Sequence, residues 1–91
     1  MSESNQITGR QIAAARALAG IGQADLAASS SVSIPTLRRM EASAGAAAGL
    51  PNNVAAVRRA LEAAGVIFVA ENGEGPGVRL RKPDQSATDS H

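Results

Sequence analysis

The stretch Gln23-Ala-Asp-Leu-Ala-Ala-Ser-Ser-Ser-Val-Ser-Ile-Pro-Thr-Leu-Arg-Arg-Met-Glu41 decides the fold of this 91-residue chain. Its pattern predicts two short helices with a tight bend between them. We expect the first helix to span residues 23–28, with Leu26 and Ala27 facing the core, and residues 29–31 to form the bend. Val32, the next apolar residue, would fill the corner that the bend leaves open.

The second half of the stretch carries the start and the buried side of the second helix. Ser33 is predicted to cap this helix, because a serine hydroxyl accepts a hydrogen bond from a free N–H of the first turn. Pro35 falls inside that turn, where its missing N–H costs little. Leu37 and Met40 are three residues apart and share one face, which we expect to be buried.

This succession of apolar, small and capping residues resembles the helix-turn-helix of the lambda-repressor-like family, also called the XRE or Cro/C1 type. The residues that carry the resemblance are Gln23, Leu26, Ala27, Val32, Ser33, Pro35, Thr36, Leu37 and Glu41. The resemblance extends back through Arg16 and Gly20-Ile21-Gly22 and forward to Gly65, roughly two thirds of the chain. The implied fold is mostly α: a four- to five-helix lambda-repressor-like helix-turn-helix domain followed by a C-terminal β-hairpin.

The resemblance also implies contact with DNA, because the second helix of such a motif enters the major groove with its N-terminal residues near base edges. The residues carried over to DNA contact are Gln23, Ser33, Ile34, Pro35, Thr36, Arg38 and Arg39. Gln23 would hold a phosphate through its backbone N–H at a helix N-terminus. Arg39 is the candidate for guanine, Arg38 for a phosphate and Ile34 for a thymine methyl group.

Two departures from the family pattern bear on this function. Ser31 stands where the family has a glycine in the bend, and serine is disfavoured there if the backbone has a positive φ. Ile34 and Pro35 offer no hydrogen bonds to bases, so one arginine and two hydroxyls remain for direct recognition. An alternative therefore stays open. The same fold would serve as a protein-interaction module, such as an anti-activator, that binds another regulator through this apolar surface or through the hairpin.

A charged pair is expected to hold the domain together. Arg16 lies near the buried side of the helix that precedes the motif. In the family that the chain resembles, an arginine at this place pairs with a glutamate late in the recognition helix, which here is Glu41. We therefore predict a largely buried Arg16–Glu41 salt bridge, which fixes geometry and is costly to break from one side.

Composition places the chain among small single domains and excludes several kinds of site. There is no cysteine, and the only histidine is the terminal His91, so we expect no metal site. Carboxylates are not clustered in the sequence, and the glycines at 73, 75 and 77 are predicted to form a turn rather than a phosphate loop. We expect no enzymatic activity and no cofactor. No apolar run of membrane length and no signal peptide is visible, so the expected location is cytoplasmic.

The charge distribution is uneven although the formal net charge is only +1. All nine basic residues lie between Arg10 and Lys82, a span with five acidic residues, so that span carries about +4 (9 − 5). This excess is compatible with a nucleic-acid partner without demanding one. Twenty residues are alanine, which leaves few large apolar side chains for a core. A second subunit would supply the additional buried surface that a small domain needs.

Capping signals and spacing set the expected boundaries around the motif. Residues 1–7 are expected to form a flexible tail, and the helix-turn-helix domain to cover residues 8–65. A capping box, Thr8-x-x-Gln11, predicts the first helix to begin near Gly9, and Gly20 predicts its end. The expected inner face of this helix is Ile12, Ala15 and Ala19, with Leu18 beside it.

The segment after the motif is predicted to be a small-residue loop followed by the last helix. Asn52 or Asn53 is expected to cap a helix over residues 54–64. Its expected buried stripe is Val54, Val57, Leu61 and Ala64.

Two short β-rich runs, 66–70 and 78–81, flank a Gly-rich turn and predict a β-hairpin over residues 66–82. The first run is apolar on both faces; one face can cover the helices and the other needs a different cover. We therefore predict that the hairpin helps to form a homodimer, by face packing or by edge pairing. The expected dimerisation residues are Val66, Ile67, Phe68, Val69, Val78 and Leu80, and residues 83–91 are expected to form a disordered tail.

Together these features predict a small transcriptional regulator, of repressor or antitoxin type, that binds a palindromic DNA site as a dimer. The expected partners are double-stranded DNA, a second copy of the chain and, for the alternatives above, another regulatory protein or a toxin. A membrane is not an expected partner.

Overall fold

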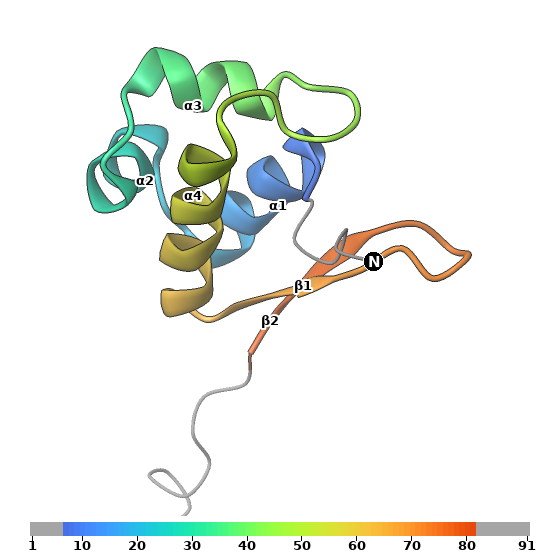
Figure 1. The fold of residues 1–91 in the computed structure, drawn as a ribbon. Helices are drawn as coiled ribbons and strands as arrows, with labels where there is room; N and C mark the ends of the chain where they lie inside the picture. Colours follow the sequence, from blue (N-terminus) through green and yellow to red (C-terminus); the bar gives the residue numbers. More distant parts are fainter. Residues whose placement is uncertain (1–6, 82–91) are drawn as a thin grey trace, which may run out of the picture.

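The computed structural model describes residues 7–81. Its elements, in chain order, are α1 (Gly9–Ala19), α2 (Gln23–Ser30), α3 (Ile34–Glu41), α4 (Pro51–Ala63), β1 (Val66–Val69) and β2 (Gly77–Leu80). The helices gather on one side of the antiparallel β1–β2 hairpin, and α3 lies on the side of the bundle farthest from it (Figure 1). The predicted mostly helical architecture with a C-terminal hairpin is therefore confirmed, with four helices in the described part of the chain. The predicted tails over residues 1–6 and 83–91, and Lys82 at the end of the predicted hairpin, lie outside these residues.

Helix α1 begins and ends as its capping residues predict. The Thr8 hydroxyl accepts a hydrogen bond from the Gln11 N–H (3.0 Å), and the Gln11 side chain accepts one from the Thr8 N–H (2.8 Å). At the other end, Gly20 adopts a left-handed conformation with φ 71°, which glycine tolerates without a steric penalty.

The assignment of Ile7 to a flexible tail is wrong. Its side chain is 2% exposed and belongs to the core. The backbone is fixed as well, because the Ala47 N–H donates to the Ile7 carbonyl (2.9 Å) and the Gly9 N–H donates to the Gly45 carbonyl (3.1 Å). The small-residue segment after α3 is thus pinned against the start of α1 rather than being a loose spacer.

Two helix boundaries differ from the predicted ones. Helix α2 continues to Ser30, because the buried Ser30 hydroxyl donates back to the Leu26 carbonyl (2.6 Å) and so needs no partner outside the helix. Helix α4 begins at Pro51, and neither Asn52 nor Asn53 caps it; Leu50 is the N-cap residue, without a side-chain hydrogen bond. A proline at the first helical position has its φ already fixed and has no N–H to satisfy, so the helix begins there.

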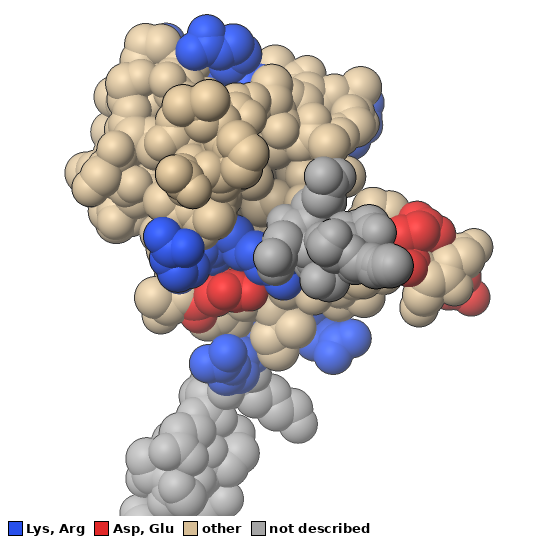
Figure 2. Space-filling model, in the orientation of Figure 1, with Lys and Arg blue, Asp and Glu red and all other residues tan. Residues whose placement is uncertain are grey.

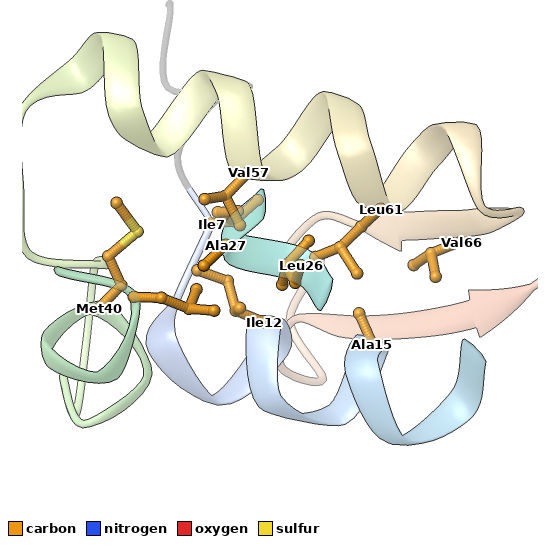
Figure 3. Packing of buried hydrophobic residues seen from close by; sticks show 10 residues of the cluster. Ile7, Ile12, Ala15, Leu26, Ala27, Met40, Val57, Leu61 and Val66 are labelled. Atoms are coloured by element: carbon orange, nitrogen blue, oxygen red, sulfur yellow. The ribbon is translucent and has the colours of Figure 1, made fainter. Parts of the chain in front are cut away.

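The core lies between the four helices and the start of the hairpin (Figure 3). Its buried apolar residues are Ile7, Ile12, Ala15, Leu26, Ala27, Leu37, Met40, Val57, Leu61 and Val66. Most predicted inward positions are among them. The exceptions are Leu18, which is 45% exposed, Ala19 and Val54, which are half-buried, and Ala64, which is exposed.

The hairpin is docked on the helices through one of its faces. Val66 and Phe68, which alternate onto one face of β1, face the core, with Val78 of β2 beside them. The side-chain amide of Gln11 donates to the carbonyls of Val69 (3.3 Å) and Gly77 (2.9 Å), so it ties both strands to α1. The full burial of Val66 within its own chain corrects its assignment as a dimerisation residue.

At Gly9, the first residue of α1, the helix lies close against the backbone at the end of α3. A Cβ at this position would meet the Met40 carbonyl oxygen at the end of α3 and lie 2.6 Å from the Ser43 carbonyl oxygen. The positive N-terminal end of α1 therefore rests against the negative C-terminal end of α3, an arrangement that the dipoles of both helices favour.

Replacing Gly9 with alanine should lower the free energy of unfolding by about 2 kcal/mol, as overpacking against backbone does. Helix propensity alone would give the opposite sign, because alanine is the better helix former. Chemical denaturation measures the change. Gly45→Ala is the matched control, since a Cβ there meets no atom within 4 Å, and an unchanged stability of Gly9→Ala would contradict the close approach.

Candidate nucleic-acid interface

Helix α3 divides into a buried side and an exposed side. Leu37 and Met40 are fully buried in the core, as their spacing predicts. Pro35, Arg38 and Arg39 are exposed on the other side. Figure 2 shows basic side chains at the top of the molecule, where α3 lies, with no acidic side chain beside them on that face. The exposed side of α3 is therefore a basic surface on a helix whose opposite side is held by the core.

The start of α3 is capped as predicted. The Ser33 hydroxyl accepts a hydrogen bond from the Thr36 N–H (3.2 Å), and it also donates to the Thr36 hydroxyl (2.8 Å). Ser33 has an extended backbone, and Pro35 lies in the first turn of the helix. The two hydroxyls thus point toward each other, and the Thr36 hydroxyl keeps its own proton for an external acceptor.

The predicted ion pair between Arg16 and Glu41 is present and bidentate. Arg16 Nε lies 2.8 Å from Glu41 Oε2, and Arg16 Nη2 lies 3.1 Å from Glu41 Oε1. Arg16 Nη1 also donates to the Ile21 carbonyl (3.2 Å), at the corner between α1 and α2. The Glu41 side chain is 9% exposed and that of Arg16 is 24% exposed. The carboxylate is therefore nearly buried, whereas the guanidinium is partly in contact with solvent.

The same carboxylate receives a hydrogen bond from α2. Gln23 Nε2 donates to Glu41 Oε1 (3.1 Å), and Gln23 Oε1 accepts a long hydrogen bond from Arg38 Nε (3.4 Å). Hydrogen bonding to Glu41 raises the pKa of Arg16 above its ordinary value. Because the pKa of Arg16 is higher in the folded state, its charged form stabilises the fold fully at any pH below the unfolded-state pKa. This contribution is lost only as the pH rises through the folded-state pKa, so Arg16 stays charged at every physiological pH.

The bend between α2 and α3 has a strained residue. Ser31 has φ 60° and ψ 36°, and it has the only positive φ among the non-glycine residues from 7 to 81. This is the position where the resembling family has glycine, and the conformation is the one for which a side chain is disfavoured. The chain accepts the strain because the Val32 N–H donates to the Ala27 carbonyl (3.0 Å), which closes the end of α2.

The N-terminus of α2 lies beside α3 and has no side-chain cap. Its N-cap residue is Gly22, in an extended conformation. Because the first N–H groups of a helix have no partner within the helix, they are directed at solvent or at an anion. Asp25 is the one acidic residue in this first turn, and it is exposed.

The structure brings the seven residues of the predicted DNA-contact set onto two adjacent helices and their connection, but with unequal exposure. Ser33, Pro35, Arg38 and Arg39 are exposed, whereas Gln23, Ile34 and Thr36 are half-buried. Ile34 packs against the core, so only part of its apolar surface is accessible. The sequence assigned Gln23 a backbone role alone; its side-chain bonds to Glu41 and Arg38 depend on the packing of α2 against α3, which residue spacing does not reveal.

Removing one partner of the ion pair should be costly. Arg16→Met is expected to lower the free energy of unfolding by about 3 kcal/mol, the lower end for a buried pair, because Glu41 keeps its charge in a nearly buried position. Urea denaturation measures the loss, with Arg10→Met, an exposed arginine on the same helix, as the control. The double variant Arg16→Met/Glu41→Leu should recover at least half of the loss, and an Arg16→Met variant as stable as the parent would exclude a structural role for the pair.

Relief of the strain at Ser31 should be visible as added stability. Ser31→Gly is expected to raise the free energy of unfolding by about 0.5 kcal/mol. Glycine removes the steric cost of the left-handed conformation, and the greater conformational entropy of glycine in the unfolded chain offsets part of that gain. Ser29→Gly provides the contrast, because Ser29 lies inside α2 and its replacement by glycine should lower the free energy of unfolding by about 0.5 kcal/mol. A loss of stability in both variants would show that Ser31 is not strained.

The chain matches no known family and no curated protein. Within residues 7–81, no three side chains of His, Cys, Asp or Glu lie close enough together to hold a metal ion. No helix in that part of the chain is both long and apolar enough to cross a membrane. The feature that remains is the basic exposed side of α3, anchored from behind by the Arg16–Glu41 pair.

Proposed function

We propose that this protein is a small DNA-binding transcriptional regulator with a lambda-repressor-like helix-turn-helix, in which α3 is the recognition helix. The observation that carries the proposal is the exposure of Arg38 and Arg39 on a capped helix whose orientation is fixed by the Glu41 ion pair. A recognition helix must hold its base-reading side chains at a defined depth and angle in the major groove. Rigid support from the core meets that requirement.

Each exposed group has a role in this proposal. Arg39 hydrogen-bonds a guanine through O6 and N7, the commonest specific contact in the major groove. Arg38, held near α2 by Gln23, contacts a phosphate, and the uncapped N-terminus of α2 contacts another. The free proton of the Thr36 hydroxyl serves a phosphate or a base acceptor. These contacts position α3 and give it a short recognition sequence.

The regulator works as a homodimer on a palindromic site in this proposal. Two α3 helices related by a two-fold axis would read half-sites about 34 Å apart, one turn of the duplex. The β1–β2 hairpin supplies the contact between the subunits. A protein of this size acts as a repressor by occupying its site, or as the DNA-binding half of a toxin–antitoxin pair.

A second function is favoured by the state of the hydroxyls at the start of α3. The Ser33 hydroxyl is bonded to Thr36, and the adjacent Ile34 and Pro35 have no polar group for a base, so direct recognition rests mainly on Arg39. The same surface fits a protein-interaction module that binds another regulator through Ile34 and Pro35.

The test is selection of bound sequences from a random duplex pool, followed by binding measurements on the enriched site. We expect a palindrome, and Arg39→Ala should weaken binding to it by about 1–3 kcal/mol per half-site and relax the base preference at one position. Arg38→Ala should instead weaken binding to all sequences and reduce the slope of log K against log salt by about one.

The control is Arg59→Ala, which removes the same charge from an exposed position on α4. It should leave the selected site and its affinity unchanged. Salt-sensitive binding without an enriched sequence would contradict sequence-specific recognition by α3. Absence of binding even at low salt would contradict the DNA-binding proposal and favour the protein-interaction module.

A further inference from the structure

The β2 strand presents a free edge. The Arg81 N–H donates to the Gly65 carbonyl (2.7 Å), which fixes the alternation of hydrogen-bonded pairs along the hairpin. In this antiparallel register, Val78 and Leu80 direct their own N–H and C=O groups away from β1. Within residues 7–81, these outward groups have no hydrogen-bond partner. An open strand edge of this kind is a template for pairing with another strand.

The β1 edge is less accessible than the β2 edge. Val66 is fully buried, and Phe68 is half-buried beneath the Arg58 guanidinium, which lies 5.2 Å from the ring centre. On β2, Leu80 is 44% exposed, and Arg79 and Arg81 are exposed as well. An incoming strand would therefore reach β2.

Charge along the hairpin is separated between its two ends. Glu71 and Glu74 lie in the turn, and Arg79 and Arg81 lie toward the other end of β2. Figure 2 shows acidic side chains at the tip of the hairpin and basic ones where β2 ends. The Glu71 carboxylate is fixed at the tip by the N–H groups of Gly73 (2.8 Å) and Gly75 (3.0 Å). A second hairpin placed antiparallel beside the first would bring each acidic tip against a basic end, a complementary arrangement.

We infer that the partner at this edge is a second copy of the chain, whose β2 pairs antiparallel with β2 to give a four-stranded sheet. Repulsion between like charges selects among the possible two-fold registers, since like charges directly opposite each other are destabilising. A register centred on Arg79 places this arginine opposite itself, and one centred on Leu80 places Arg79 opposite the partner's Arg81. A register centred on Val78 places Arg79 opposite the partner's Gly77.

The Val78-centred register also satisfies the outward groups. Val78 exchanges two hydrogen bonds with the partner's Val78, and the Leu80 N–H reaches the carbonyl of the partner's Pro76. Pro76 has no N–H to donate, which is tolerated at the beginning of a strand. Arg81 then lies opposite the partner's Gly75 and next to the partner's Glu74, so opposite charges meet at both ends of the new pair.

The position of α3 distinguishes edge pairing from face packing, and this step rests on the proposed function. The helices cover one face of the hairpin, and α3 lies on their far side (Figure 1). Two hairpins stacked through their uncovered faces would send the two α3 helices to opposite sides of the dimer. Edge pairing about an axis perpendicular to the sheet keeps both α3 helices on the same side, as a palindrome on one duplex requires.

The first experiment measures the mass of the full chain in solution by analytical ultracentrifugation. The parent should be a dimer, and Glu74→Arg and Arg81→Glu should each raise the dimer dissociation constant about tenfold or more. An equimolar mixture of the two variants should recover the dimer, because each junction of the mixed dimer joins opposite charges. Arg59→Glu, a charge reversal outside the hairpin, is the control and should not change the mass. A monomeric parent, or a dimer insensitive to both hairpin variants, would overturn the inference.

The second experiment locates the contact by oxidative cross-linking of the cysteine-free chain. In a hydrogen-bonded antiparallel pair the Cα atoms are about 5.5 Å apart, which suits a disulfide, so Val78→Cys should cross-link rapidly to its partner. Val69→Cys, on the uncovered face of β1, should not; cross-linking of Val69→Cys alone would show face packing and overturn the edge register. A monomeric parent that still binds DNA would count against this inference and against the homodimer of the proposed function, but not against DNA binding by α3. A dimer that binds no DNA would count against the proposed function only.

Discussion

The Arg16–Glu41 ion pair determines how the three N-terminal helices sit on one another. The nearly buried carboxylate of Glu41, the last residue of α3, accepts two hydrogen bonds from α1, at 2.8 and 3.1 Å. It accepts a third from Gln23 of α2, at 3.1 Å. The four large side chains that these helices bury, Ile12, Leu26, Leu37 and Met40, contribute hydrophobic contact, which is non-directional and leaves the angle between helices poorly defined. Directional polar bonds supply that definition here. They act at the same end of α3 at which Gly9 lets α1 approach the backbone, so orientation and distance are fixed at one place.

Local signals predicted much of this fold, and the failures have a common cause. The capping box of α1, the serine cap of α3, the buried pair Leu37 and Met40, and the two faces of β1 all depend on residues within one turn or one strand of each other. The resemblance supplied the ion pair. The predictions failed at Ile7, whose burial depends on backbone pairing with residues 45–47, and at the start of α4, where Pro51 took precedence over the asparagines. They also missed the second role of Gln11, because its bonds to Val69 and Gly77 span about sixty positions of sequence.

The candidate interface was predictable to the same degree. Which residues lie on α3 followed from the pattern, and the structure places Arg38 and Arg39 on its exposed side. The pattern did not reveal which of these residues are available for contact, because availability depends on packing. Ile34 turns partly toward the core, and the Gln23 side chain is taken up by Glu41 and Arg38. The strain at Ser31 was visible as a missing glycine, but only the structure shows that the bend keeps the left-handed conformation with serine in that place.

The fold separates charges that the composition averages away. The formal net charge of +1 hides a difference between the basic exposed side of α3 and the acidic tip of the hairpin. Glu41 is neutralised by Arg16 in the interior, and Glu62 is paired with Arg58 on α4 at 3.0 Å, so these two acids do not offset the exposed arginines of α3. Glu71 and Glu74 are carried away from the helices on the hairpin turn. A polyanion approaching α3 therefore meets the field of Arg38 and Arg39 with Asp25 as the nearby opposing charge, and the acidic hairpin lies on the opposite side of the bundle. That separation is what gives a nearly neutral chain a basic surface on α3 and an acidic tip on the hairpin, the two features on which the proposed DNA contact and the proposed pairing of two copies depend.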